Sequence, residues 1–162
     1  MKLELEHKFP KSVAKVWAMY ADRAFFERKL KNLGYTNISI TNYSSSDKGF
    51  SITMRYDAKS DAKLPDFAKK FVGETSSVTE TDTWDAATKT GKISVEIKGA
   101  PVKVNCEMRL EAAGKGSVNK LSWTLSCGIP LIGGKLERII AEDVEAKSSK
   151  DNLASAKILE DY

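Results

Sequence analysis

The feature that most constrains this chain is a change of pattern in its last third, where an alternating strand gives way to one long helical run. The residues at the change are Cys127-Gly-Ile-Pro-Leu-Ile-Gly-Gly-Lys135. Pro130 has no N–H for a sheet ladder, and the glycine pair that follows lets the backbone turn sharply. A helix from Lys135 toward Tyr162 would be roughly 40 Å long at about 1.5 Å per residue. A helix of that length needs a surface to lie on, and the strand-rich remainder of the chain can supply it.

Composition predicts a single soluble domain that spans residues 1–162. Of these 162 residues, 41% are hydrophobic and 30% are charged, which suffices for a buried core. The net charge of +4 is spread along the chain without a basic stretch interleaved with aromatics, which argues against nucleic acid as a partner. No apolar run approaches the roughly 18 residues of a membrane span, and the N-terminus has no secretion-signal pattern. We therefore expect a cytoplasmic protein.

Periodicity predicts the order of elements before the long helix. Lys2–Phe9 alternates as a strand with His7 inward, Ser12 caps a short helix, and a second helix covers residues 22–33. Six further strands are expected near residues 36–40, 50–56, 76–84, 92–98, 102–111 and 118–129, with a polar loop at 58–65 and one or two helical turns at 66–72.

An antiparallel sheet with one apolar face needs a cover, and the long helix is available for it. The predicted fold class is α+β: a helix-grip arrangement, in which about seven antiparallel strands wrap around the C-terminal helix and two short helices follow the first strand. Because a twisted sheet of this size cannot fill all the space under one helix, we expect a cavity there.

Alternation and turn position also predict which residues face one another. A turn at residues 114–116 sets Leu110 near Asn119, Met108 near Leu121, Cys106 near Trp123 and Val102 near Cys127. The two cysteines are then not partners, so we predict two reduced, buried thiols, and no Cys and His cluster suggests a metal site. A second hairpin sets Trp84 near Ile93.

The chain resembles the START-like superfamily with the helix-grip fold, which includes the birch-pollen allergen, bacterial polyketide cyclases and aromatases, and ubiquinone-binding START proteins. Within it, the chain is similar to a bacterial family of START-like proteins without an assigned function. The likeness rests on Phe9-Pro-Lys-Ser-Val-Ala-Lys-Val-Trp17, Val78-Thr-Glu-Thr-Asp-Thr-Trp84 and Pro130-Leu-Ile-Gly-Gly-Lys-Leu-Glu137. The resemblance implies an internal pocket for lipids or other apolar molecules. It transfers no catalytic residues and no cofactor.

Three acidic or basic side chains are candidates for chemistry. The predicted register places Glu80 and Asp82 on the apolar face with Val95 and Ile97, where carboxylates are costly unless they are paired, protonated or hydrated. Either they hold a ligand hydroxyl or act as acid and base, or a bulge turns them to solvent. His7 is either a proton donor or ligand contact in the pocket, or a core residue with a hydrogen-bond partner.

Two further segments leave alternatives open. Asp143, Lys147, Lys150 and Asp151 fall within the apolar stripe of the long helix, so either its middle crosses a cavity or the helix turns Leu153 inward. The apolar residues of segment 66–72 form either a lid that touches membranes transiently or a piece packed on the sheet edge.

The first functional hypothesis is a non-enzymatic carrier or sensor of a hydrophobic small molecule or lipid. The predicted ligand-binding residues are Trp84, Val95, Ile97, Val104, Met108, Trp123, Leu136, Ile140 and Asp143. The second is a cyclase, dehydratase or hydrolase that uses an inward carboxylate with His7, and the third is a protein-interaction module with an exposed apolar patch.

Overall fold

The computed structural model describes residues 1–61 and 63–162. In this part of the chain seven strands form one antiparallel sheet in the order β1-β7-β6-β5-β4-β3-β2. The strands are β1 (Lys2–Phe9), β2 (Thr36–Ser46), β3 (Gly49–Lys59), β4 (Thr75–Asp85), β5 (Thr90–Ile97), β6 (Val102–Ala113) and β7 (Gly116–Cys127). The helices are α1 (Val13–Tyr20), α2 (Arg23–Asn32), the 3-10 turn η1 (Ala68–Lys70) and α3 (Gly133–Leu159).

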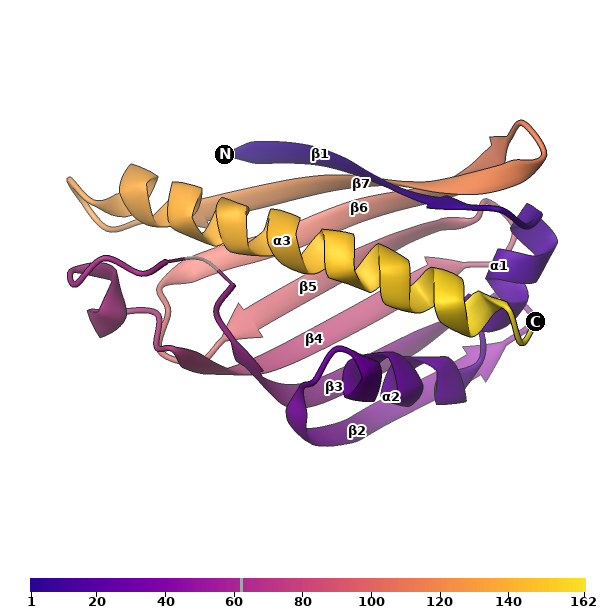
Figure 1. The fold of residues 1–162 in the computed structure, drawn as a ribbon, viewed down its shortest axis with the longest axis horizontal. Coiled ribbons are helices and arrows are strands. Elements are labelled where there is room, and N and C mark those ends of the chain that lie inside the picture. The colour runs from indigo at the N-terminus through magenta and orange to yellow at the C-terminus, as the bar shows by residue number, and fades with distance from the viewer. Residues whose placement is uncertain (62) are drawn as a thin grey trace.

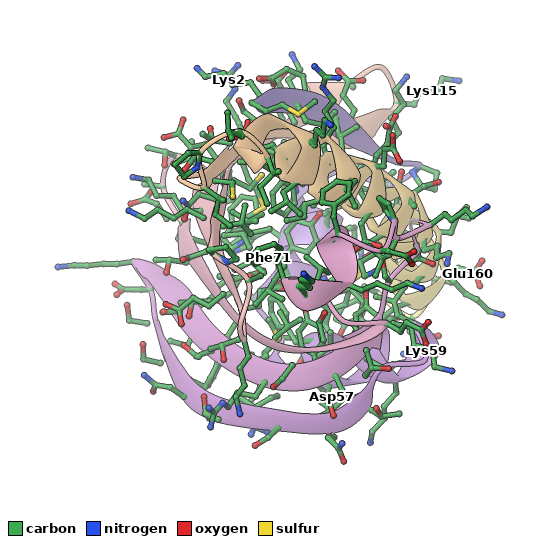
Figure 2. The ribbon with its side chains drawn as sticks, turned by 90° about the vertical axis from the view of Figure 1, so that its left-hand side faces the viewer. Lys2, Asp57, Lys59, Phe71, Lys115 and Glu160 are labelled. Atoms are coloured by element: carbon green, nitrogen blue, oxygen red, sulfur yellow. The ribbon has the colours of Figure 1, made fainter. Side chains whose placement is uncertain are left out.

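Helix α3 lies across one face of the sheet, with α1 and α2 beside its C-terminal half (Figure 1). Seen from the end at which α3 begins, the sheet curves like a trough beneath the helix, and side chains fill much of the space between them (Figure 2). The predicted helix-grip architecture is therefore confirmed, with its 27-residue C-terminal helix and its two short helices after β1.

The two short helices begin and end where local chemistry dictates. The Ser12 side chain accepts a hydrogen bond from the Lys15 N–H, and the Asp22 side chain accepts one from the Ala24 N–H. Helix α2 is followed by Gly34 at a φ of 80°, a left-handed conformation that glycine adopts without a side-chain clash. These caps place the apolar faces of both helices against the sheet.

An aromatic cluster fills the space under α1 and α2. The Tyr20 and Trp84 rings lie 5.4 Å apart, and Trp17 lies 6.0 Å from Trp84. Phe26 and Phe50 extend the cluster with ring centroids 5.9 Å apart. This end of the trough is therefore packed with rings, and the remaining space lies further along α3.

The predicted register between β6 and β7 is confirmed at every pair, including Cys106 opposite Trp123 and Met108 opposite Leu121. The predicted register between β4 and β5 is wrong by two residues, because Trp84 pairs with Gly91 and not with Ile93. The connecting turn is tighter than expected: Lys89 takes a φ of 54° and β5 begins at Thr90. A shift of two residues keeps the same side chains inward.

The junction between β7 and α3 has the predicted length but lies two residues earlier in the chain than predicted. Strand β7 ends at Cys127, and α3 begins at Gly133, where an added Cβ would meet the Cys127 carbonyl oxygen at 2.6 Å. Glu137 fastens this turn by accepting a hydrogen bond of 2.9 Å from the Cys127 N–H. Both cysteines are free, as predicted, but Cys127 is only half-buried because it is the last residue of the sheet.

Candidate functional site

A cavity of about 160 Å³ lies between the inner face of the sheet and α3. An engineered apolar cavity of about 150 Å³ can hold one benzene molecule. The exposed Lys59 and the half-buried Ser60 and Lys147 border the space, so it reaches the surface on that side. Its size therefore suits a small ring system or a short chain.

One side of the cavity is apolar. We call Ile93, Val95, Ile97, Val104 and Met108, all on β5 and β6, the apolar wall. Val95 pairs with Val104 across the two strands, so alternation directs the side chains of this hairpin to one face.

Most of the residues predicted to contact a ligand border this space. Those that line it are Trp84, Val95, Ile97, Val104, Met108, Trp123, Ile140 and Asp143. Leu136 is buried but is not part of the lining, because the first turns of α3 pack against the end of β7 beyond the cavity.

The other side of the cavity is polar. We call His7, Lys29, Glu80, Asp82, Ser148 and Asp151 the polar wall, and all six line the cavity. They come from β1, α2, β4 and α3. This wall sets the charge and hydrogen bonding that a ligand would meet.

Lys29 and Asp151 form an ion pair in the polar wall, with Nζ 2.9 Å from Oδ2. Burial alone would lower the pKa of Lys29, but the carboxyl groups of Asp151, Glu80 and Asp82 raise it above its ordinary value. Burial alone would raise the pKa of Asp151, and the Lys29 ammonium group lowers it below its ordinary value. Both groups are therefore charged at neutral pH and neutralise each other.

His7 connects β1 to α3. Its Nε2 lies 2.7 Å from the Ser148 hydroxyl oxygen, and its Nδ1 lies 3.9 Å from a carboxylate oxygen of Asp151. Burial lowers the pKa of His7 below 6.5, although the Asp151 carboxylate opposes this shift. The imidazole is thus neutral at pH 7. His7 has the hydrogen-bond partner of a core residue and also faces the cavity, and its contact with a ligand stays a prediction.

Asp82 is buried on the inner face of the sheet, with 4% of its surface exposed. Burial, and next the neighbouring Glu80 carboxyl group, raise the pKa of Asp82 well above its ordinary range. Glu80 accepts a hydrogen bond from the Tyr56 hydroxyl, and the Tyr56 ring stacks on Tyr35 with centroids 4.8 Å apart. These surroundings therefore favour the uncharged form of the Asp82 side chain over its carboxylate.

The bulge considered for the strand that carries Glu80 and Asp82 is wrong. Strand β4 pairs without interruption with β3, and its pairing with β5 runs unbroken from Val78 to Asp85. Continuous pairing preserves the alternation that turns both carboxyl groups inward.

The charged residues in the stripe of α3 lie at the cavity and its mouth. Lys147 donates hydrogen bonds to Asp143 at 2.9 Å, Asp61 at 3.1 Å and the Lys59 carbonyl oxygen at 2.7 Å. This network ties the chain after β3 to the middle of α3. The alternative in which the helix turns Leu153 inward is wrong, because Leu153 is 73% exposed.

The segment around η1 packs on the protein. Val72 is buried, and Leu64 and Phe71 contact the hydrophobic core. Leu64 and Val72 also line the cavity. This part of the segment therefore packs against the core and borders the cavity, while its predicted place on the sheet edge stays a prediction.

Lys29 is the main residue that the sequence predictions missed. It lies three and four residues after Phe26 and Phe25, on the apolar face of α2, and is only 7% exposed. A lysine inside an apolar helical stripe was the available signal, because a buried ammonium group needs a partner. Asp151 was noted in the stripe of α3, but nothing in the sequence pointed to its pairing with Lys29.

Neither a metal centre nor a membrane span emerges from the part of the chain that the structure describes. Within residues 1–61 and 63–162, no three His, Cys, Asp or Glu residues are grouped so that they could hold a metal ion. In the same residues, no helix combines the length and the apolar character needed to cross a membrane.

Solved structures of three other proteins have the same fold. Ara h 8.0201 aligns with a TM-score of 0.69 and 21% identity over 100% of this chain and 99% of that chain. The Zhui aromatase/cyclase from Streptomyces aligns with a TM-score of 0.65 and 13% identity over 99% of this chain and 93% of that chain. Norcoclaurine synthase from Thalictrum flavum aligns with a TM-score of 0.66 and 13% identity over 100% of this chain and 87% of that chain. At these identities the likeness establishes the fold and not the function.

A search of curated protein sequences finds no match to this chain. The model of one protein family, described as "Protein of unknown function (DUF2505)", matches residues 4–152. The structural neighbours place the fold among START-like, Bet v 1-like proteins, as the sequence motifs predicted. The chain therefore belongs to the DUF2505 family and has the START-like helix-grip fold.

Proposed function

We propose that this protein binds a small hydrophobic molecule in the cavity under α3, for transport, storage or sensing. The observation that carries the proposal is the cavity of about 160 Å³ with an unbroken apolar wall on β5 and β6. An apolar guest gains roughly 25 cal/mol for each Å² of surface that it removes from water there. Norcoclaurine synthase was solved in complex with two aromatic ligands, dopamine and hydroxybenzaldehyde, and molecules of this size class are consistent with the volume.

The geometry supports binding over the acid–base alternative. His7 is bonded to Ser148, whereas Glu80 is bonded to Tyr56, and among the described residues no hydrogen bond joins His7 to either carboxyl group of β4. General acid–base catalysis by the predicted pair needs both groups within about 3 Å of each other or of one shared ligand atom. The cavity walls offer binding surfaces without that arrangement.

The interaction-module alternative has less support. In the described part of the chain the large exposed hydrophobic residues are Met1, Leu131 and Leu153, and none of them lies on a strand. The outer face of the sheet therefore lacks the contiguous apolar patch that a protein partner of this kind needs.

Mass spectrometry tests the binding function. Native spectra and solvent extraction of the purified protein are expected to reveal one small apolar molecule per chain, or uptake of one after incubation with an apolar extract. V95F fills the cavity and should abolish the complex, whereas S94F places the same ring on the outer face of the same strand and should not. Equal loading of V95F and wild type would contradict the assigned site.

We also propose that the protein touches membranes transiently at one end. Leu131 is fully exposed in the loop between β7 and α3, at a φ of 70° that leucine rarely adopts. The 3-10 turn η1, which carries the exposed Lys69 and Lys70, lies at the same end of the molecule as the loop between β7 and α3 (Figure 1). An apolar tip beside lysines suits the surface of an anionic bilayer.

Flotation with vesicles of phosphatidylcholine and phosphatidylserine tests this contact. L131N keeps a residue that tolerates positive φ and should reduce the bound fraction severalfold, whereas Leu153→Asn on α3 should leave it unchanged. Equal flotation of L131N and wild type would contradict the proposal.

A further inference from the structure

Three buried polar atoms, each on a residue that lines the cavity, have no hydrogen-bond partner among the described residues. They are Asp82 Oδ1, Asn119 Oδ1 and Trp123 Nε1. Asp82 is 4% exposed, Asn119 is 2% exposed and Trp123 is 9% exposed, so bulk water does not serve them from the surface. An unpaired buried polar atom costs about 1–3 kcal/mol, and proteins rarely leave one in a core without a function.

The three atoms belong to residues on the same inner face of the sheet. Asp82 pairs with Ile93, Ile93 with Cys106 and Cys106 with Trp123, so Asp82 and Trp123 lie in one row across β4 to β7. Asn119 lies further along on the same side of β7, and its Nδ2 lies 3.3 Å from the Tyr20 hydroxyl. A guest lying on the apolar wall between these strands has polar groups at its edges.

The charges at the site select against ionic groups. The Lys29 ammonium group is already neutralised by Asp151, so it offers little attraction to an anionic ligand. Burial and the neighbouring Glu80 carboxyl group raise the pKa of Asp82 well above its ordinary range, so this part of the cavity disfavours negative charge, and the Lys29–Asp151 pair offers no net charge to a cation. The unpaired atoms comprise the Trp123 N–H donor, the Asn119 carbonyl acceptor and an oxygen of Asp82, and a hydroxyl group can both donate to and accept from such a set.

We propose that the ligand is an uncharged hydroxyl-bearing molecule, a phenol or an alcohol on a small apolar ring system, whose hydroxyl group pairs with the unpaired Trp123 N–H at one edge of the site. The proposal rests on the binding function proposed above and specifies the chemical class of the ligand. The ring lies against β5 and β6, and the hydroxyl group supplies the partner that the Trp123 N–H lacks.

Titration with naphthalene, 2-naphthol and 2-naphthoate, followed by two-dimensional 1H–15N NMR spectra of the tryptophan side chains, tests the proposal. These probes share one ring system and differ in the polar group. We expect 2-naphthol to bind at least about tenfold tighter than naphthalene, because a hydrogen bond replaces buried unpaired atoms. We expect 2-naphthoate to bind the weakest, and the Trp123 Nε1–H resonance to shift on addition of 2-naphthol.

Two matched variants assign the effect. Trp123→Phe keeps an aromatic ring but removes the unpaired donor, and it should reduce the preference for 2-naphthol over naphthalene severalfold while naphthalene still binds. Trp84→Phe also removes an indole from the cavity lining, but its nitrogen is not among the unpaired atoms, so the preference should persist. Binding of naphthalene to each variant verifies that it is folded.

The outcomes separate the two proposals. Equal affinity for naphthalene and 2-naphthol in the wild type, or tightest binding of 2-naphthoate, overturns the hydroxyl class and leaves the binding function standing. Full preference in Trp123→Phe overturns the assigned contact with Trp123. If none of the three probes enters the cavity, the binding function fails together with this inference.

Discussion

The two walls of the cavity differ in how the chain builds them. The apolar wall comes from one hairpin, β5 and β6, whose inward residues follow from alternation alone. The polar wall brings together residues as distant in sequence as His7 and Asp151. For the proposed ligand, the apolar wall would provide nonspecific affinity and the polar wall selectivity, and the polar wall costs stability unless its groups are paired.

The largest expected effect concerns the ion pair of the polar wall. Lys29→Met leaves the Asp151 carboxylate without its cation, and we expect the free energy of unfolding to fall by about 3–5 kcal/mol. Urea denaturation measures this loss. Arg28→Met is the control next to it: Arg28 pairs with Asp161 in solvent, so its loss should cost about 0–1 kcal/mol.

A double variant separates the unpaired charge from the loss of packing. Lys29→Met combined with Asp151→Leu replaces both charges by apolar groups and should recover most of the stability. A double variant as unstable as Lys29→Met alone would contradict the view that the polar wall is balanced by this pair.

The next effect compares a cavity-lining residue with a fully packed one on the same helix. Ile140 lines the cavity, whereas Ile158 is completely buried and does not. We expect Ile158→Ala to cost toward the upper end of about 2–5 kcal/mol and Ile140→Ala toward the lower end, because Ile140 already borders open space. Thermal and urea denaturation of the two variants decide this, and a larger loss for Ile140→Ala would mean that the cavity is smaller than described.

The sequence predicted the apolar wall well because periodicity and turns determine it. Strands β6 and β7 are joined by a short glycine turn, and their predicted pairs, such as Cys106 with Trp123, are all confirmed. The predicted pairing of Trp84 was wrong by two residues because Lys89 takes a positive φ and the turn is shorter than expected. Nothing in the sequence indicates a positive φ at this lysine. Even there the inward face was correct, since two residues make one full period.

The polar wall was only partly predictable. Each of its acidic residues stood out as a charge in an apolar pattern, including Asp82 in β4 and Asp151 in α3. Their partners depend on how α2 and α3 cross, which tertiary packing decides and local periodicity does not. Lys29 was therefore missed, although its position beside Phe25 and Phe26 marked it as inward.

The pH dependence of stability should reflect His7. Its pKa in the folded protein is lowered below 6.5 by burial, so below pH 6.5 the unfolded chain binds a proton that the folded protein resists. Stability should therefore fall as the pH drops from 7 to 5, by no more than about 1.4 kcal/mol per pH unit from this group. His7→Gln should lessen this fall while its amide can still reach Ser148. An unchanged pH profile in His7→Gln would contradict a neutral, buried imidazole.

The smallest effect is expected outside both walls. Leu153 is exposed on α3, and Leu153→Ser should change the free energy of unfolding by no more than about 0.5 kcal/mol. Urea denaturation measures it. A loss comparable to that of Ile140→Ala would mean that the helix face is assigned wrongly.

The most direct test of the two-walled cavity is a crystal structure of the protein with 2-naphthol. We expect the ring to lie against Val95 and Val104 under α3, with the hydroxyl oxygen within hydrogen-bond distance of Trp123 Nε1. A ligand bound outside the cavity, or one inside it with the hydroxyl group against the apolar wall, would contradict the assignment of the two walls.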